Sequence, residues 1–236
     1  GGINANNLLN ELKKPAQDME TEKVNIPGQP FRTLVKYKNI NKLYFRIIKT
    51  SREEIKRMEK DGYDIRWKDI VGLASLKSWS ISFPEQGDYQ EHAAEIKIDA
   101  LPAGTYFILS SMRPDFSLTD NIISRVITHV SSISYIINNK KDLYVLDRDN
   151  GTPLAGAEVQ FWSSQYNYNS RVYEEIKKEK YTTDANGYIK VKPTVVKNYE
   201  TYNSFIQVKY NKQELYTDDT YYMYDNYNSY QKRSDK

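Results

Sequence analysis

Hydrophobic and polar residues alternate over many short stretches of this chain, and this alternation predicts a protein built mainly of β-strands. Residues 31–38 alternate in this way, and residues 43–47 repeat the pattern after a turn at residues 39–41. A period of two residues is typical of a strand with one buried face. On the same grounds, further strands are expected at residues 76–83, 94–98 and 105–111.

One helix interrupts the strands of the first half. Ser51 is followed three residues later by Glu54, the spacing of a capping box, and Ile55 and Met58 then fall on one helical face. Gly62 follows the expected end. The sequence therefore predicts a short helix inserted between strands, with its charged residues on a solvated face.

A break in the alternation near Ser131 indicates a boundary between two domains. Val126 and Val130 belong to one register, whereas Ile133 and Ile137 belong to the other. A slip of one residue turns every side chain to the opposite face, so two strands must meet there. The expected organisation is a lead-in linker at 1–23, a sandwich at 24–131, a second sandwich at 132–224, and a linker at 225–236 towards a following domain.

The second half carries enough alternating segments for one complete sandwich. About seven strands in ~100 residues are typical of an immunoglobulin-like fold. Asn186-Gly187 is expected to close a tight hairpin with positive φ. Residues 165–177, rich in Tyr, Asn and Ser, are expected to form a long loop. The strands are expected at residues 133–138, 142–147, 158–162, 178–183, 188–192, 204–210 and 214–221.

Several of these segments resemble one protein family in their amino-acid sequence. Residues 147–159 read Asp-Arg-Asp-Asn-Gly-Thr-Pro-Leu-Ala-Gly-Ala-Glu-Val, and residues 182–188 read Thr-Thr-Asp-Ala-Asn-Gly-Tyr. Both are similar to a macroglobulin-like domain of bacterial alpha-2-macroglobulins. Residues 26–47 and 101–106 resemble the opening and a late turn of the preceding domain, so the similarity covers roughly residues 24–224 in order.

The resemblance implies a fold and a function. The fold is all-β, with two tandem immunoglobulin-like (macroglobulin-like) β-sandwiches and a short helical insertion in the first. The function is that of non-catalytic scaffold domains in a cell-envelope alpha-2-macroglobulin-like protein that traps proteases. The implied partners are neighbouring domains of the same longer chain and, for the full-length protein, host or foreign proteases. Such proteins are exported to the periplasm or outer cell envelope, with any membrane anchor outside this segment.

Tyrosine is the unusual feature of the composition and supports an alternative. The chain has 21 tyrosines against 7 phenylalanines, and nine of them lie between Tyr199 and Tyr230. Packing on half-buried strands explains most of them. The alternative is a surface binding module, an adhesin or a carbohydrate-binding part, with Trp162, Tyr166, Tyr168 and Tyr173 as candidate contacts. A third class, an accessory sandwich of a large envelope hydrolase, is weaker.

Composition and charge argue against several other classes. Basic residues number 34 and acidic residues 31, interspersed along the chain, which does not favour nucleic-acid binding. No apolar run approaches the ~20 residues of a membrane span. With no cysteine, the chain has neither a disulfide nor the internal thioester that some family members carry.

Residues suited to catalysis or metal binding are sparse. The two histidines, His92 and His129, lie in separate segments without a glycine elbow nearby. Asp147, Asp149 and Gly151 suggest a calcium loop, but the sixth-position glycine and closing glutamate are missing, so a hairpin turn is favoured. We therefore expect no enzyme activity, no metal and no cofactor.

Overall fold

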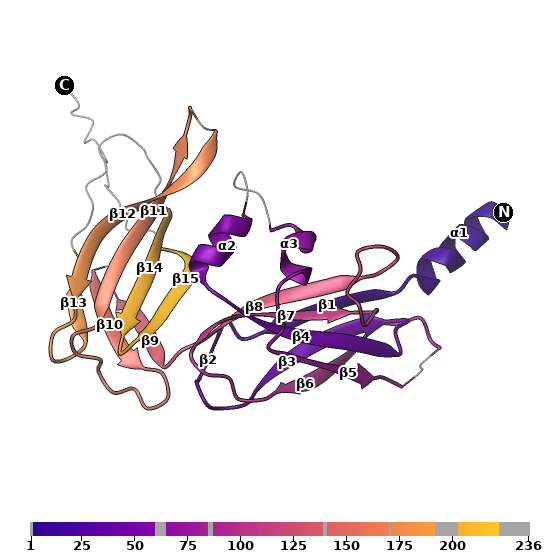
Figure 1. Cartoon of the computed structure of the whole chain (residues 1–236), viewed down its shortest axis with the longest axis horizontal. Helices are drawn as coiled ribbons and strands as arrows, with labels where there is room; N and C mark the ends of the chain where they lie inside the picture. The colour runs from indigo at the N-terminus through magenta and orange to yellow at the C-terminus, as the bar shows by residue number, and fades with distance from the viewer. Residues whose placement is uncertain are drawn as a thin grey trace, which may run out of the picture. The chain divides into compact units, whose positions relative to one another are not determined.

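The computed structural model describes residues 2–59, 65–84, 87–138, 141–169, 171–191 and 203–221. In this part of the chain strands predominate over helices, and the predicted all-β class is confirmed (Figure 1). The chain divides into two compact units, Gly1–Ser132 and Ile133–Lys236, and each contains its own β-sandwich.

The first unit pairs a three-stranded sheet with a five-stranded one. Neighbouring strands are antiparallel in both sheets except for the parallel pair β2 and β8. The three-stranded sheet has the order β1 (Ala16–Thr21), β3 (Phe31–Lys38), β6 (His92–Ile98). The five-stranded sheet has the order β2 (Val24–Asn25), β8 (Ile123–Val130), β7 (Gly104–Ser111), β4 (Lys42–Thr50), β5 (Lys77–Ser82).

Alternate residues of these strands fill the core between the two sheets. Val35 on β3 and Phe45 on β4 are fully buried there, and Trp79 on β5 stacks on Phe45 with ring centroids 5.2 Å apart. Tyr106 is also fully buried, and its hydroxyl donates to the backbone oxygen of Pro102 at 2.8 Å. The period-two pattern of the sequence therefore marks this core correctly.

Two short helices cover the outer face of the five-stranded sheet. Helix α2 (Arg52–Met58) begins with the predicted capping box, since Ser51 Oγ accepts from the Glu54 backbone N–H and Glu54 Oε2 accepts from that of Ser51. Helix α3 (Trp67–Val71) buries Ile70 against β4 and β7 residues such as Phe107. Because β7 is covered on both faces, it is buried from Tyr106 to Ser111.

The structure differs from the expected linker at residues 1–23. Residues Gly2–Lys13 form helix α1, and β1 pairs with β3 along its whole length. Met19 is the one apolar side chain that β1 buries in the core. Gln17, two residues before Met19 on the same strand, makes a polar contact instead, and its side-chain oxygen accepts a hydrogen bond from Ser110 Oγ at 2.7 Å. A strand with one buried apolar residue leaves no alternation for sequence analysis to detect.

The second unit pairs a three-stranded sheet with a four-stranded one, all antiparallel. Val159, Phe161 and Ile206 are among the residues buried between the sheets, and the Tyr135 hydroxyl is 2.7 Å from Thr217 Oγ1 of the facing sheet. The three-stranded sheet has the order β13 (Tyr188–Lys190), β10 (Asp142–Asp147), β9 (Ile133–Asn138). The other has the order β12 (Val172–Thr182), β11 (Glu158–Asn167), β14 (Asn203–Tyr210), β15 (Gln213–Tyr221).

Two expectations for this unit are wrong. Residues 165–177 are not a long loop, because β11 and β12 continue through most of them as one long hairpin. Asn186-Gly187 does not close a strand pair either, since β12 before it and β13 after it belong to different sheets. It lies instead in a turn that carries the chain from one sheet to the other. Residues 225–236 lie outside the described residues.

Candidate functional site

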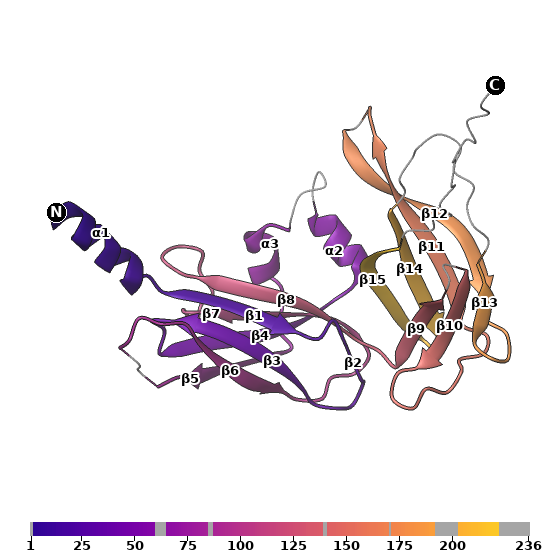
Figure 2. The ribbon, with the colours of Figure 1, turned by 180° about the vertical axis from the view of Figure 1, so that it is seen from behind.

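The hairpin of β11 and β12 presents the most exposed aromatic residues among those that the structure describes in the second unit. Residues 158–164 of β11 pair with β14 on one side and β12 on the other. Residues 165–167 pair with β12, and no other described strand flanks them. The end of the hairpin therefore extends beyond the neighbouring described strands, as Figures 1 and 2 show.

Three of the four predicted contact residues form one cluster at this end. The ring of Tyr166 is 5.2 Å from that of Tyr168 and 5.1 Å from that of Tyr173, centroid to centroid, and both contacts are edge-to-face. Tyr168 is 85% exposed and Tyr173 is 68% exposed. Edge-to-face packing fixes the rings relative to one another while leaving their hydroxyls and outer faces in water.

Trp162, the fourth predicted contact, lies on the outer face of the sheet, apart from the tyrosines. Its ring is half-buried and its indole N–H donates to Gln207 Oε1 at 3.0 Å. Lys177 Nζ lies 5.4 Å from the ring centroid. Trp162 and Tyr166 share a strand face but are separated by four residues, about 13 Å at the usual rise. The structure therefore brings together the tyrosines but not all four residues.

Sequence analysis missed two aromatic neighbours on the same face. Phe205 is directly opposite Trp162 on β14, and Tyr216 follows on β15 with its ring 6.2 Å from that of Phe205. The Tyr216 hydroxyl donates to Glu175 Oε1 at 3.2 Å. Only the strand order places these rings together, so the sequence alone gave no signal for them.

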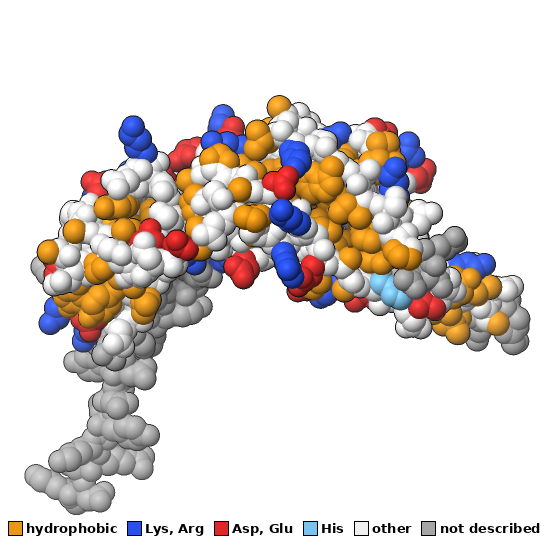
Figure 3. All heavy atoms as spheres, turned by 90° about the horizontal axis from the view of Figure 1, so that it is seen from below, with side chains coloured by type: hydrophobic (Ala, Val, Ile, Leu, Met, Phe, Trp, Pro, Cys, Tyr) orange, Lys and Arg blue, Asp and Glu red, His pale blue; other side chains and the backbone are white. Residues whose placement is uncertain are grey.

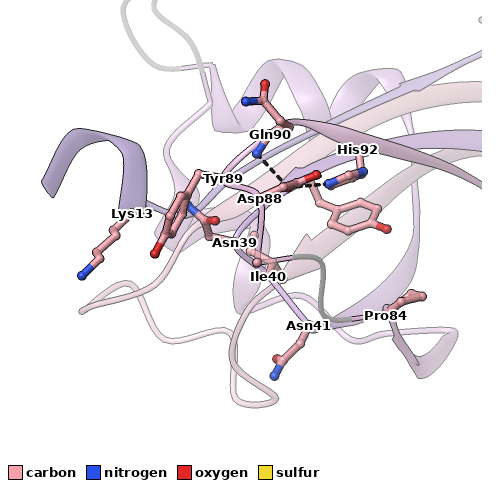
Figure 4. Close-up of a pocket in the computed structure, with 11 residues that line it drawn as sticks. Lys13, Asn39, Ile40, Asn41, Pro84, Asp88, Tyr89, Gln90 and His92 are labelled. Atoms are coloured by element: carbon pink, nitrogen blue, oxygen red, sulfur yellow. Dashed lines mark hydrogen bonds and ion pairs between the residues drawn. The ribbon is translucent and has the colours of Figure 1, made fainter. Parts of the chain in front are cut away.

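The first unit has an open pocket of about 360 Å³ at one end of its sandwich. It is lined by the last residue of α1, by the end of β3 with the β3–β4 turn, and by the β5–β6 connection with the first residue of β6 (Figure 4). Its residues are Lys13, Tyr37, Asn39, Ile40, Asn41, Pro84, Gly87, Asp88, Tyr89, Gln90 and His92. Sequence analysis identified none of them as a site, because they are scattered and form no motif.

Asp88 organises one wall of this pocket. Its Oδ1 accepts a hydrogen bond from the Gln90 backbone N–H and lies 3.0 Å from His92 Nε2, as the dashed lines of Figure 4 show. These contacts, the Gln90 N–H first and His92 second, lower the pKa of Asp88 below its usual value. His92 in turn lies against Tyr37, with ring centroids 5.8 Å apart.

Asn39 joins the β3–β4 turn to the end of helix α1. Its Nδ2 donates to the backbone oxygens of Leu12 at 2.7 Å and Lys14 at 3.2 Å. Carbonyl groups at a helix C-terminus have no partner within the helix, so these bonds satisfy two oxygens at the end of α1. Lys13 between them is thereby held at the rim of the pocket.

The two histidines have different partners. His92 contacts Asp88, whereas His129 on β8 places Nδ1 3.0 Å from Thr105 Oγ1. A Ser–His–Asp site needs a nucleophilic hydroxyl beside the histidine. None of the described residues lining the His92 pocket is a serine, threonine or cysteine.

The Asp147 loop forms a turn. Asp147 Oδ1 accepts from the backbone N–H groups of Asp149 and Asn150, and the Gly151 N–H donates to the Asp147 backbone oxygen at 2.9 Å. That carboxylate oxygen is thus occupied by its own loop. Within the described residues there is no group of three or more His, Cys, Asp or Glu placed to hold a metal ion.

The molecular surface mixes charges of both signs. On the face viewed in Figure 3, basic and acidic side chains stand beside one another and among hydrophobic ones. This agrees with the small net charge of +3. Among the helices that the structure describes, none has the length and apolar character needed to cross a membrane.

Comparison with solved structures relates the fold to bacterial alpha-2-macroglobulins. The chain superimposes on native Escherichia coli alpha-2-macroglobulin spanning domains MG0-NIE-MG1 with a TM-score of 0.53 and 13% identity, over 86% of this chain and 64% of that one. At this identity the match establishes the fold, and the resemblance seen in the sequence is confirmed at that level. The chain thus spans less than two thirds of that structure.

Two further matches are weaker. Salmonella alpha-2-macroglobulin reacted with methylamine gives a TM-score of 0.35 at 8% identity, covering 87% of this chain and 16% of that one. Escherichia coli alpha-2-macroglobulin activated by porcine elastase gives 0.32 at 11% identity, covering 89% and 22%. Scores this low add nothing to the fold assignment. No family model and no curated protein matches the sequence.

Proposed function

We propose that this chain consists of two consecutive macroglobulin-like domains that act as a non-catalytic scaffold in a bacterial alpha-2-macroglobulin-like protein. The superposition on the Escherichia coli MG0-NIE-MG1 structure, which extends over most of the chain, is the observation that supports the proposal. The order of the similar segments along the sequence supports it independently.

The proposal includes a place and a set of partners. The full-length protein is exported to the periplasm or outer cell envelope and traps host or foreign proteases. The two domains, bounded near Ser131, hold neighbouring domains of the same chain in position. Two sandwiches with separate cores suit this role, because each offers a preformed surface to a neighbour.

A protease-capture assay on the full-length natural protein tests the proposal. Porcine elastase should co-elute with the full-length protein, keep its activity on a small peptide substrate, and lose it on a large protein substrate. The isolated 236-residue chain should neither co-elute with elastase nor lower its activity on either substrate. Elastase that elutes separately from the full-length protein and is fully active on both substrates would contradict trapping. Inhibition of elastase by the isolated chain would contradict a scaffold role.

A second candidate function is a surface binding module that uses the hairpin. The exposed cluster of Tyr166, Tyr168 and Tyr173 favours it, since aromatic anchors dominate binding interfaces. A glycan-array screen of the chain and of its Tyr168→Ala and Trp162→Ala variants decides between the two functions. Binding to one sugar class that Tyr168→Ala abolishes supports the module, and unchanged or absent binding supports the scaffold.

A further inference from the structure

Strand β5 is an open edge of the first unit. It is the last strand of the five-stranded sheet, and no described strand flanks it on the side away from β4. At the opposite side of the sandwich, β1 lies against β8, and Gln17 of β1 bonds to Ser110 of the facing sheet. The sandwich is therefore closed by side-chain contacts at one side, whereas the edge of β5 has no strand partner.

The backbone of β5 offers unused hydrogen-bonding groups at this edge. The Phe83 N–H, just after the strand, donates to the Asn41 oxygen at 2.8 Å in register with the β4–β5 ladder. In an antiparallel pair, every second residue directs both its N–H and its C=O to the same neighbour. Trp79 and Ile81 therefore bond to β4. The residues between and beside them direct their groups to the open side: Ser78, Ser80 and Ser82.

This edge lacks the charges that usually prevent strands from pairing. Of the other long edge strands of the first unit, β1 carries Asp18 and Glu20, and β6 carries Glu95 and Lys97. The one charged residue of β5 is Lys77, at its first position, and it forms an ion pair with Asp99. An exposed edge without charge, proline or bulge is a template for another strand.

Two apolar side chains of β5 are incompletely covered at the same edge. Trp79 and Ile81 pack against the core of the first unit but are only half-buried, whereas Phe45 beside Trp79 on β4 is fully buried. Strand β5 lies on the lower side of the first unit in Figure 1, and the view from that side in Figure 3 shows exposed hydrophobic side chains. A further strand beside β5 would cover Trp79 and Ile81.

The sequence of β5 is complementary to itself. When two copies pair antiparallel about Ser80, Ser78 lies opposite Ser82, and the three serines exchange about six backbone hydrogen bonds. Trp79 of each copy then lies opposite Ile81 of the other, at a position where side chains approach most closely. Pairs of an aromatic and a β-branched residue are among the favourable cross-strand pairs.

We propose that β5 pairs with β5 of a second copy of this chain, which joins their two five-stranded sheets into one. The charges permit this, because Lys77 falls opposite Phe83 of the second copy and no like charges meet. Since both copies contribute the same strand, the contact closes as a dimer with two-fold symmetry. A contact of this size is small, so association depends on concentration. The proposal does not depend on the scaffold role.

Sedimentation velocity of the 236-residue chain, from micromolar to millimolar concentration, tests for the dimer. The mass should rise from that of a monomer to that of a dimer. Amide hydrogen exchange then locates the contact: Ser78, Ser80 and Ser82 should gain protection with concentration, whereas Trp79 and Ile81 are protected by β4 throughout. A chain that stays monomeric, or a dimer without added protection at the serines, would overturn the proposal.

Charges placed at Ser80 test the register, because the two-fold axis sets this residue opposite itself. Ser80→Lys and Ser80→Glu should each weaken self-association at least about 5-fold, since like charges then lie directly opposite one another. The two variants mixed should form a dimer again, with a lysine opposite a glutamate, which native mass spectrometry detects. Unchanged self-association of either variant, or a mixture that stays monomeric, would overturn the proposal.

Two further variants separate pairing from indirect effects. Ser80→Pro removes an N–H that does not bond to β4, a place where an edge strand tolerates proline, and should weaken association about 10-fold. Thr182→Lys adds the same charge as Ser80→Lys at an exposed position on β12 of the second unit and should have no effect. Circular dichroism checks that each variant is folded. Equal weakening by Ser80→Lys and Thr182→Lys would show that β5 is not the contact and overturn the proposal.

Discussion

Gly187 occupies a position at which both the backbone and its surroundings require glycine. Its φ is +67°, and a Cβ there would lie 2.4 Å from the backbone oxygen of Val145. The turn cannot easily move away from this oxygen, because the backbone N–H of Val145 donates a hydrogen bond to the Gly187 oxygen at 2.7 Å. The turn is thus pressed against β10, where it crosses from one sheet of the second unit to the other.

We predict that Gly187→Ala destabilises the second unit by at least about 2 kcal/mol, through left-handed strain together with the steric clash. Gly151→Ala is the matched control. Gly151 has φ of +74° but no atom within 4 Å of its Cβ position, so only the strain of about 1 kcal/mol applies. Urea unfolding followed by tryptophan fluorescence, to which Trp162 contributes from the second unit, measures both. Equal losses in the two variants would show that the close contact does not matter.

Tyr188 gives a prediction about pH. Its hydroxyl donates to Asp142 Oδ1 at 2.7 Å, and this bond, with burial and the carboxylate charge, raises the pKa of Tyr188 to about 12. The folded state therefore holds the proton more tightly than the unfolded state, whose tyrosine titrates near 10. The resulting stability is complete below pH 10 and is lost as pH rises towards 12.

We predict that Asp142→Asn returns the pKa of Tyr188 towards its ordinary value, because the substitution removes the negative charge and the charged acceptor. The ¹³C signal of the Tyr188 ring followed against pH measures this pKa directly. Tyr144→Phe is the control and should lower this pKa less, since Tyr144, at a ring-centroid distance of 5.1 Å, contributes less to the shift than Asp142. An unchanged pKa in Asp142→Asn would show that Asp142 is not the cause.

The turn at Asn186-Gly187 also shows what a local pattern predicts about single residues. The tight turn was predicted, and Gly187 has the expected positive φ, whereas Asn186 does not. The Gly187 N–H donates to the Asp184 oxygen at 3.0 Å, and Asp184 Oδ1 accepts from the N–H groups of Asn186 and Tyr188. Asp at the first position and Gly at the fourth fit a type I turn, so the aspartate is as informative as the Asn-Gly pair.

At the scale of elements, helix α2 depends on its cap. It spans seven residues, too few to be stable alone, and none of its side chains is fully buried. We predict that Ser51→Ala costs the first unit about 1 kcal/mol, because the Glu54 N–H loses its acceptor. Hydrogen exchange of the α2 amides, with urea unfolding, measures the effect. Ser80→Ala on β5, at an exposed position, is the control and should change neither.

Two elements escaped prediction for a common physical reason. The end of the β11–β12 hairpin is exposed, so its side chains do not alternate between a core and solvent. Strand β1 buries one apolar residue, Met19, and uses Gln17 for a polar contact across the sheets. Hydrophobic alternation reports burial of one face, and it cannot detect a strand that is held mainly by its backbone partners.

At the scale of the whole molecule, the sequence predicted the fold class and the three tyrosines of the hairpin cluster, but it could not predict the pocket or the outer aromatic face. The sandwich cores follow from alternation at positions such as Val35 and Phe161. The pocket requires α1, the β3–β4 turn and the β5–β6 connection to meet, and the outer aromatic face requires Phe205 and Tyr216 to lie beside Trp162. Both depend on which strands pair, and that order is not contained in local patterns.

The division of the chain yields the last prediction. The alternation changes phase at Ser131, and the structure divides between Ser132 and Ile133. Each side contains a buried core of its own, with Phe45 in the first and Phe161 in the second. A unit that buries its own core should fold alone, so residues 1–132 and 133–236, expressed separately, should each unfold cooperatively in urea.

The urea unfolding curves of the two pieces, added together, should also reproduce the unfolding curve of the whole chain. Circular dichroism follows both pieces, and Trp162 reports on the second piece while Trp67 and Trp79 report on the first. A chain cut instead after residue 109, within β7, is the control, because it divides one five-stranded sheet and should leave the first piece unfolded. If the piece 133–236 were unfolded on its own, the second sandwich would need the first for its stability, and the proposed boundary would not separate independent domains.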